Sequence, residues 1–420
     1  MKFRSVKPLL AGSLLCWLTF AACSTTEQQV DELLDTLAGN EIGSDEWNRA
    51  VDGLVEIGRP AARQLSAHLD PAKYVGDNYR EHRLEIEKIR TGCARALGRI
   101  KPRAAGPKLA ACITKTFTDS ERLACLWGVG EIGFDQASVD ALKKELKREE
   151  TAPAEIAAEN PMIRVQLAIS MIKMDEYLAV DEISSAISGA DQELAGQALD
   201  GLSNANYFGV PLLVELAGKS AARKAEIAAV LEEVKGQLIR QLNAEEPEIR
   251  YQSARALGRI GDRTVAADLI SVLDDPSNLV RFNAAAALAN MDDDEGIRFL
   301  FEPLRNDDPT LRLNAVRFLT EVQRQTGAVE KDLIDALDGS DPLSRSGAAQ
   351  VLGQAEVAAS VPALLGATKS DAAEVRWNAA IALGQIGRAE SRGRLQELLT
   401  DTDATVAYYA RWALKQLGQT

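Results

Sequence analysis

The stretch that decides the fold is VRWNAAIALGQIG, residues 375–387. Its apolar and small residues recur at the spacing of one face of an α-helix, and its last glycine is typical of a helix C-terminus. Related stretches are IRYQSARALGRIGD from residue 249, VRFNAAAALANMDD from 280, LRLNAVRFLTEVQ from 311, SRSGAAQVLGQAE from 344 and VAYYARWALKQLG from 406. The chain is therefore built from an internal repeat.

An arginine near the start of most copies sets the period, and its position in each copy is here called the anchor. Arg250, Arg281, Arg312, Arg345 and Arg376 are spaced by 31, 31, 33 and 31 residues. The same frame runs back through Arg164, Arg122 and Arg90 to degenerate copies at Ala195 and Trp47, with an irregular copy near Arg223. We expect these arginines to join adjacent repeats by hydrogen bonds and charge, because they lie beside Asp-bearing turns.

Each repeat is predicted to contain two helices. A second apolar set follows the first, as at Leu333 and Leu337. Asp-Asp-Pro at 274–276 and 307–309, and Ser-Asp-Pro at 340–342, separate one repeat from the next. Asp is a favoured helix cap and Pro fits the first turn, while glycines such as Gly133, Gly261 and Gly387 end the first helix.

The repeated V-R-x-x-A-A-x-A-L-G-x-I-G run resembles HEAT repeats of the short type found in bilin lyases. The resemblance covers nearly everything from about residue 27 to Gly418. It implies an all-α fold, an α-solenoid (superhelix) of about twelve HEAT-like helix pairs over residues 29–420. Two inserts interrupt it, near 71–87 and 149–161. The first contains Tyr74, Asp77, Tyr79, Arg80 and His82, and is either a solvated loop or a functional one.

The N-terminus has the pattern of a secretory signal. Lys2, Arg4 and Lys7 precede an apolar run over 9–22, which is too short for a typical membrane span. Phe20-Ala21-Ala22-Cys23 resembles a bacterial lipobox, although Phe20 departs from the usual aliphatic residue. The resemblance implies a signal peptide over 1–22, lipidation of Cys23, a short tether over 23–28 and, with Ser24 next, a place at the outer membrane. A plain secreted protein with an incidental cysteine is the alternative.

Composition and motifs argue against several functions. The 420 residues contain 48 basic and 62 acidic side chains, a net charge of −14, which disfavours binding of nucleic acid. With only His68 and His82, we expect no catalytic residues, no metal and no cofactor. The G-x-G-x-x-G at 128–133 is one copy of the repeat rather than a dinucleotide fingerprint, because no strand is expected before it.

Three cysteines remain after the signal segment: Cys93, Cys112 and Cys125. An odd number is unusual in an oxidising compartment. All three are read as small buried hydrophobic residues, while a bridge between Cys112 and Cys125 stays open.

A candidate partner-binding groove lies one and two positions after the anchor. In HEAT solenoids the anchor-bearing helix lines the concave surface, so amides there can bind an extended peptide while neighbouring apolar rings add contact area. The alternative is that the amides satisfy turn carbonyls and the rings fill gaps between repeats. The candidate residues at these positions are Tyr251, Gln252, Phe282, Asn283, Leu313, Asn314, Trp377, Asn378, Tyr408 and Tyr409, and Trp412 on the last helix is added to them as a further aromatic candidate.

These features favour a lipid-anchored cell-envelope scaffold, on the periplasmic or the outer face, that binds a protein or peptide and catalyses no reaction. One alternative is a structural protein that associates with itself through the C-terminal helix, where Tyr408, Tyr409 and Trp412 form an aromatic patch. The other is a bilin-lyase-like accessory enzyme, which only the type of repeat supports.

Overall fold

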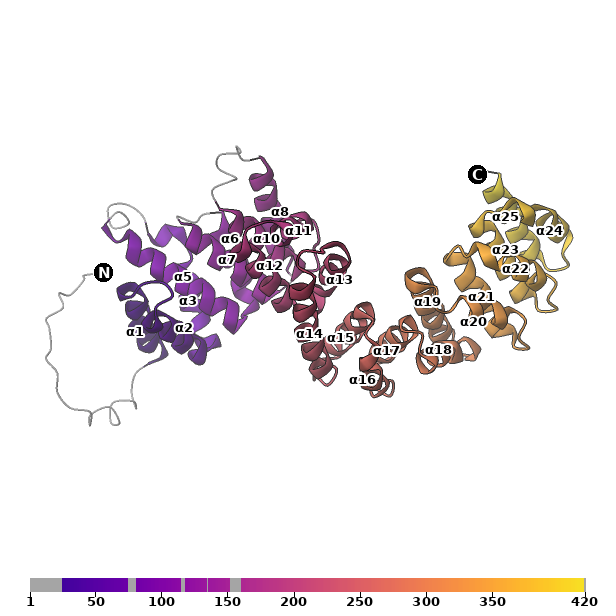
Figure 1. Ribbon diagram of the computed structural model, residues 1–420, viewed down its shortest axis with the longest axis horizontal. Coiled ribbons are helices and arrows are strands. Elements are labelled where there is room, and N and C mark those ends of the chain that lie inside the picture. The colour runs from indigo at the N-terminus through magenta and orange to yellow at the C-terminus, as the bar shows by residue number, and fades with distance from the viewer. Residues whose placement is uncertain (1–24, 75–80, 115–117, 134, 152–159, 419–420) are drawn as a thin grey trace. The chain divides into compact units, whose positions relative to one another are not determined.

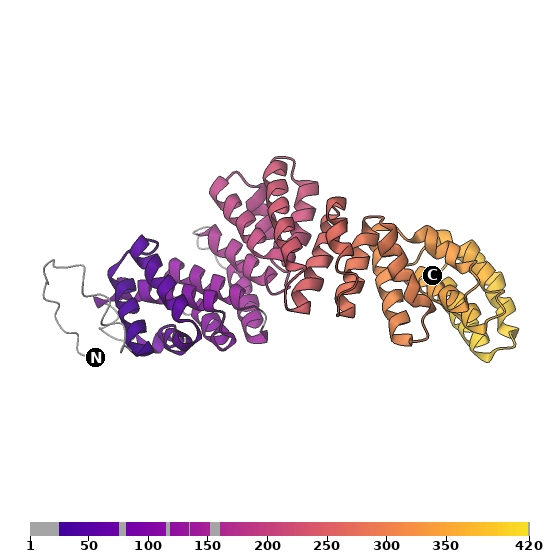
Figure 2. The ribbon, with the colours of Figure 1, turned by 90° about the horizontal axis from the view of Figure 1, so that it is seen from below.

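The computed structural model describes residues 25–74, 81–114, 118–133, 135–151 and 160–418. These residues form α-helices and short 3-10 helices and no strand, which confirms the predicted all-α solenoid. They divide into two compact units at Gly201–Leu202, here called unit 1 and unit 2, with consecutive helices stacked within each (Figures 1 and 2). The predicted signal segment, Cys23, Asp77, Tyr79, Arg80 and the middle of the second insert lie outside the described residues.

Unit 1 contains most of the early repeats. A leading helix, α1 (Thr26–Gly39), packs on α2 and α5. The first helices and their second helices are α2 (Asp45–Ile57) with α3 (Ala62–His68), α5 (Arg83–Ile100) with α6 (Gly106–Ile113), α7 (Asp119–Ile132) with α8 (Gln136–Thr151), and α10 (Pro161–Ile172) with α11 (Val180–Ser188), followed by α12 (Gln192–Asn204). Each anchor residue therefore lies on a first helix, as predicted.

Unit 2 continues with α13 (Val210–Lys219) and α14 (Lys224–Gln241). Regular pairs follow: α15 (Pro247–Ile260) with α16 (Ala266–Ile270), α17 (Asn278–Asn290) with α18 (Asp294–Phe301), α19 (Pro309–Thr326) with α20 (Glu330–Leu337), α21 (Pro342–Gln354) with α22 (Val361–Ala367), and α23 (Ala373–Ile386) with α24 (Arg392–Glu397), and then α25 (Ala404–Leu417). The sequence predicts a single solenoid over 29–420, with two inserts and no division into units. The division falls between the degenerate copy at Ala195 and the irregular one at Arg223, where α14 leads into α15 without a second helix.

Two predicted boundaries differ from those observed. Helix α1 begins at Thr26, inside the predicted tether, because Thr25 and Gln28 form a reciprocal capping box. Helix α5 begins at Arg83, so the end of the first insert, residues 83–87, is helical rather than a loop.

The turns between repeats follow the predicted chemistry with one exception. Asp308 and Asp341 accept hydrogen bonds from backbone N–H groups in the first turns of α19 and α21, each with proline at the start. Helix α17 instead begins at Asn278, because the Asp275 carboxylate binds Arg250 and the Ser277 backbone. Gly133, Gly261 and Gly387 end their helices at φ of 89°, 71° and 71°.

A glycine eight residues after the anchor marks a close contact between first helices. A Cβ atom placed on Gly98, Gly258 or Gly384 would come within 2.9 Å of the Cα atom of Gly128, Ala287 or Ala413 on the next first helix. The absence of a side chain at this Leu-Gly step therefore lets consecutive first helices approach closely.

The anchor arginines fasten the repeats together, as predicted. Arg250 donates two hydrogen bonds to Asp275 at 2.7 and 3.0 Å, and two to the backbone carbonyls of Ala244 and Glu245, both at 2.8 Å. Arg376 binds Asp401 and the carbonyls of residues 370 and 371 in the same way. These guanidinium groups hold the pKa of the Asp275 and Asp401 carboxyls below the usual range.

In the part of the chain that the structure describes, the helices are all too short or too polar to span a membrane.

Candidate binding surface

The first helices of unit 1 together line a pocket of about 590 Å³, here called the tryptophan pocket. It crosses α2, α5, α7, α10 and α12, so every first helix of the unit contributes to it. Its lining residues are Trp47, Asn48, Val51, Asp52, Arg95, Arg99, Leu123, Ala124, Trp127, Met162, Gln166 and Gln197. Most of these residues lie one, two, five or nine positions after an anchor, on one helical face.

The floor of the tryptophan pocket is aromatic. The Trp47 side chain is fully buried, and its indole N–H donates to the Lys88 carbonyl at 3.4 Å. Trp127 is half-buried and packs on Gly98, where a Cβ atom would lie only 2.6 Å from the ring. The absence of a side chain at Gly98 therefore lets the Trp127 ring lie flat against α5.

The rim of the pocket is polar and carries positive charge. The Arg95 guanidinium carbon lies 5.3 Å from the centre of the Trp47 ring, within cation–π range. Arg99 forms an ion pair with Asp52. None of the acidic side chains in the described ranges pairs with Arg95, so this guanidinium is available to a ligand carboxylate. Gln166 and Gln197 add amide donors and acceptors.

This combination suits an extended peptide. Stacked helices lie about 8–10 Å apart, and an extended chain advances about 3.3 Å per residue, so roughly three peptide residues cover one helix. Apolar side chains of such a peptide would contact Trp127, Met162 and Leu123, and an acidic side chain would meet Arg95. Solenoids commonly use such extended surfaces for binding.

Three of the groove residues predicted in unit 2 are buried. Phe282 is 3% exposed and packs between Phe299 and Phe318, with ring centres at 5.9 and 5.3 Å. Asn283 and Asn378 are each 7% exposed and donate to the carbonyls of Leu279 and Glu374 on their own helices. Asn378 also donates to Ser346 at 2.8 Å. The structure thus places these amides and this ring inside the protein.

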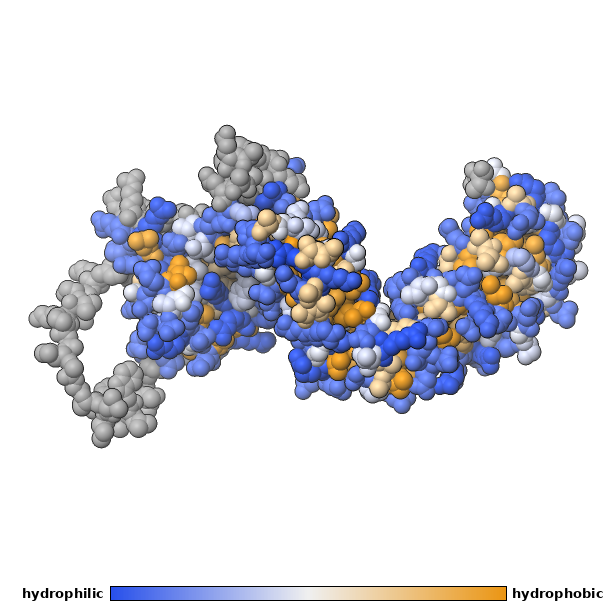
Figure 3. All heavy atoms as spheres, in the orientation of Figure 1, coloured by the Kyte–Doolittle hydropathy of each residue, from blue (hydrophilic) through white to orange (hydrophobic). Residues whose placement is uncertain are grey.

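Other predicted residues are accessible. Leu313 is 65% exposed and lines a pocket of about 650 Å³ together with Arg317, Arg324 and Gln354. Tyr408 is 61% exposed and contacts Tyr409 edge to face, whereas Trp377 and Trp412 are half-buried against the core of unit 2. Tyr251 and Gln252 both bond to Glu248, and Asn314 is half-buried. In the view of Figure 3 the described surface is mainly hydrophilic, and its apolar patches include one over the C-terminal helices.

The residues of the tryptophan pocket were missed by the sequence reasoning, which considered the positions one and two after the anchor in unit 2 and, on the last helix, Trp412. The useful signal is the position five after the anchor. Arg95 and Trp127 occupy it in consecutive repeats of unit 1, and large side chains there are unnecessary for helix packing.

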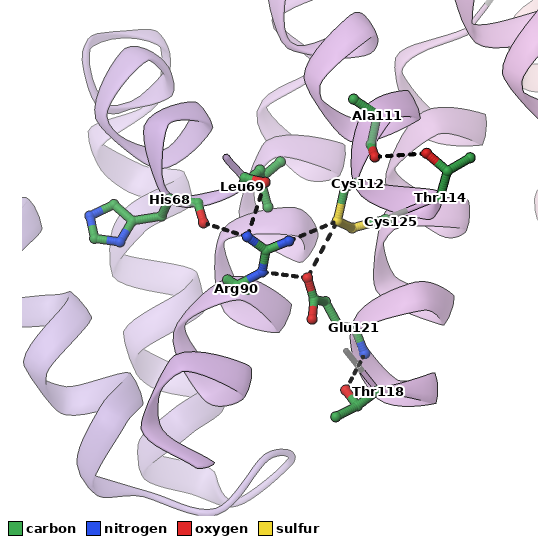
Figure 4. The surroundings of a disulfide bond; sticks show 9 residues. All are labelled: His68, Leu69, Arg90, Ala111, Cys112, Thr114, Thr118, Glu121 and Cys125. Atoms are coloured by element: carbon green, nitrogen blue, oxygen red, sulfur yellow. Dashed lines mark hydrogen bonds and ion pairs between the residues drawn. A yellow bond between two sulfur atoms is a disulfide. The ribbon is translucent and has the colours of Figure 1, made fainter. Parts of the chain in front are cut away.

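A buried polar cluster in unit 1 joins three repeats (Figure 4). The Arg90 and Glu121 side chains are both 0% exposed and form an ion pair. Arg90 also donates to the carbonyls of His68 and Leu69 at 3.3 and 3.0 Å, at the end of α3. A disulfide links Cys112 to Cys125 beside this pair, with the Cys112 Sγ atom 3.7 Å from Glu121 Oε1. The bridge between α6 and α7, left open by the sequence, is therefore present.

The described part of the first insert closes this cluster from outside. The Tyr74 hydroxyl lies 2.6 Å from His68 Nδ1, and Lys73 Nζ lies 2.6 Å from His68 Nε2. Burial, followed by the charges of Lys73 and Arg90, lowers the pKa of His68 to about 4, so the ring is neutral at pH 7. Burial raises the pKa of the free Cys93 thiol to about 12, which keeps it protonated, as expected of a small core residue. We interpret this cluster as structural.

Comparison with known proteins finds a match to HEAT repeats at residues 236–325 and 330–415, which lie in unit 2. These segments are HEAT repeats. No curated protein matches the chain.

Several solved structures are similar in fold. Human deoxyhypusine hydroxylase in complex with glycerol shares 23% identity over 57% of this chain and 96% of its own, with a TM-score of 0.26. An engineered protein shares 18% identity over 93% and 99%, with a TM-score of 0.29. The karyopherin Kap121p, bound to the extreme C-terminus of the protein phosphatase Cdc14p, shares 13% identity over 94% and 50%, with a TM-score of 0.32. At identities and TM-scores this low, the likeness extends to no ligand or partner.

Proposed function

We propose that this chain, with HEAT repeats at 236–325 and 330–415, is a lipid-anchored scaffold of the cell envelope. In this proposal it binds an extended segment of another protein on the face made by its first helices. It acts by binding, and we assign it no reaction.

The observation that carries the proposal is the tryptophan pocket. The Trp127 ring and the Leu123 and Met162 side chains stay partly exposed, which is costly in water, and a rim of arginine and glutamine gives orientation to a ligand. Aromatic and arginine side chains are also enriched at protein interfaces. The pocket at Leu313 in unit 2 also combines apolar residues with arginine and glutamine, although its lining contains no aromatic ring.

The anchoring part of the proposal rests on the sequence of the N-terminus. The positive start, the short apolar run and Cys23 support export and acylation of the chain. Two or three acyl chains make membrane attachment effectively permanent. Metabolic labelling with a palmitate analogue tests this: the full chain takes up label, whereas a Cys23→Ala variant takes up none and leaves the membrane fraction.

The binding role is tested by capture of partners from native membranes with the tagged full chain. We expect a specific protein to be recovered with the unaltered chain and lost with Arg95→Glu, which reverses a rim charge without touching the core. Leu178→Ala is the matched control, because Leu178 is 63% exposed in the same unit and lies outside the pocket. Equal recovery by all three proteins would refute binding at this pocket.

Self-association is the second candidate, and the 61% exposure of Tyr408 on α25 favours it. Truncation after residue 403 removes this helix, but it also uncovers α23, on which α25 packs. A Tyr408→Ser variant is cleaner, since it removes only an exposed ring. Self-association predicts a smaller assembly for this variant by light scattering, and an unchanged assembly would rule the candidate out.

A further inference from the structure

A second groove of unit 1 has a chemistry unlike that of the chain as a whole. It has a volume of about 930 Å³ and lies along α3, α6 and the turns that precede them. We call it the basic groove because six of its lining residues are basic: Arg59, Arg63, Lys73, Lys101, Arg103 and Lys108. Asp70 is the one acidic residue among those lining it, in a protein with a net charge of −14.

Half of these basic residues are already engaged. Lys108 pairs with Asp70 at 3.5 Å, Lys101 pairs with Glu131 at 2.9 Å, and Lys73 contacts His68. The three arginines differ. They are exposed, and within the described ranges no carboxylate pairs with Arg59, Arg63 or Arg103. Three guanidinium groups that line one groove repel one another, and a bound anion would relieve this repulsion.

The geometry of guanidinium indicates the kind of anion. Its planar fork of N–H donors matches the oxygens of a phosphate group, which it binds through paired hydrogen bonds. A groove of this volume is much larger than one phosphate ion, so several phosphate-bearing headgroups or one large one would fill it.

The position of the groove indicates where that phosphate comes from. Gln64, next to Arg63 on α3, donates to Asp31 in the N-terminal half of α1 at 2.6 Å, which joins α1 to the helix that borders the groove. Asp31 is five residues from Thr26, or about 8 Å along a helix. Cys23 is three residues further, or at most about 10 Å. If Cys23 is acylated, as proposed above, the membrane surface is within about 20 Å of this part of unit 1.

We propose that the basic groove binds the phosphate groups of anionic phospholipids and holds unit 1 against the membrane that anchors the chain. Each basic side chain near an anionic surface adds attraction that falls with salt. The groove would therefore orient the solenoid at the membrane, and this role is independent of any partner in the tryptophan pocket.

The test uses the chain from residue 24 onward, which carries no acyl group and retains every residue that the structure describes. Its binding is measured by sedimentation with vesicles of phosphatidylcholine alone and of an equal mixture with phosphatidylglycerol. We expect binding to the mixture only, weakened by added salt. A triple variant, Arg59→Ala with Arg63→Ala and Arg103→Ala, should bind about 100-fold more weakly, because each basic residue contributes about 1 kcal/mol.

The matched control removes three exposed arginines of unit 2, by Arg263→Ala, Arg298→Ala and Arg388→Ala, and so makes the same change in net charge. It should bind as the unaltered chain does, and circular dichroism should show equal helicity in all three proteins. Equal binding by the two triple variants, or equal binding to neutral and mixed vesicles, would overturn the proposal.

A further arm distinguishes a lipid from a soluble phosphate. Titration calorimetry with glycerol 3-phosphate should show no saturation below millimolar concentration. Saturation at micromolar concentration would mean that the groove takes a free phosphate compound, and the membrane assignment would be wrong. Because no acyl group is present, failure of lipidation at Cys23 leaves these outcomes unchanged and is detected separately by the labelling experiment.

Discussion

Replacing Glu121 with glutamine removes the charge that compensates Arg90 while keeping nearly the same shape. Both side chains are 0% exposed, so the Arg90 guanidinium would remain charged in a site without water. Breaking a buried ion pair by removing one partner costs about 3–5 kcal/mol of unfolding free energy. Arg90 keeps its bonds to the His68 and Leu69 carbonyls, so we expect the lower end, about 3 kcal/mol.

The assay is urea unfolding of unit 1 followed by tryptophan fluorescence. The chain from residue 24 has four tryptophans, of which Trp47 and Trp127 lie in unit 1. Changing Trp377 and Trp412 to phenylalanine leaves a signal from unit 1 alone, which matters because two units need not unfold together. The disulfide is kept oxidised throughout.

A double variant, Arg90→Met with Glu121→Met, provides the control. It removes both charges, and replacing a whole buried ion pair by apolar residues is often nearly neutral. The two carbonyls lose their donors, at about 1 kcal/mol each, so the double variant should cost about 2 kcal/mol, less than Arg90→Met alone. A loss below about 1 kcal/mol for Glu121→Gln, or additive losses in the double variant, would refute the assignment of a buried, charged pair.

Three further perturbations test the packing and the charges. Gly384→Ala should cost about 1–3 kcal/mol of unfolding free energy, because the new methyl group would lie 2.8 Å from a backbone Cα atom of α25. Gly366→Ala, with open space around the new methyl group, should be neutral or slightly stabilising. The midpoints of urea unfolding compare the two variants. The contribution of His68 to the unfolding free energy of unit 1 should be fully present above pH 6.5 and should fall by roughly 2–3 kcal/mol as the pH drops toward 4. The reason is that burial lowers the pKa of His68 to about 4 in the folded state, so the unfolded chain binds the proton first. A His68→Asn variant should lose this part of the pH dependence in the same unfolding assay. Arg376→Lys should destabilise unit 2 by about 1–2 kcal/mol, because a lysine cannot reproduce two parallel bonds to Asp401 at 2.9 and 2.8 Å together with two carbonyl contacts. Thermal unfolding measures the loss. A loss as small as that from replacing an exposed arginine would contradict the role of Arg376 in joining repeats.

The repeat could be predicted from the sequence because its signal is local and recurs. An arginine, a small pair and a Leu-Gly step recur at a period near 31 residues, and each copy specifies the same helix. The role of the anchor arginines followed from the same pattern, since Asp275 and Asp401 lie at matching places in their turns. The predicted aspartate cap failed where another group competes for the side chain, as Arg250 does at Asp275.

Exposure on the first helices could not be predicted, because it depends on the size of side chains in the neighbouring repeats. The position after the anchor is 65% exposed at Leu313, yet 3% exposed at Phe282, where two phenylalanines from adjacent helices cover the ring. The tryptophan pocket could not be predicted for the same reason. The packing of the Trp127 ring depends on Gly98 of α5, which is far away in the sequence and leaves room for the ring.

The basic groove has a weaker sequence signal that becomes clear in the structure. Five of its six basic residues come from equivalent turns of two consecutive repeats, RPAAR at 59–63 and KPRAAGPK at 101–108, and the sixth, Lys73, follows α3. Each turn taken alone is an ordinary solvated loop with a few charges. Stacking of the repeats brings the two turns together, and only then do the six basic residues line one surface.

Site-specific photo-crosslinking in living cells shows whether another protein occupies the tryptophan pocket. A photoreactive amino acid replaces Met162, which lines the tryptophan pocket, or Leu178, which is exposed elsewhere in unit 1. We expect one discrete crosslinked protein from position 162 and none from position 178, with the product lost when Arg95→Glu is added. No product at position 162, or the same products from both positions, would contradict a binding role for this surface.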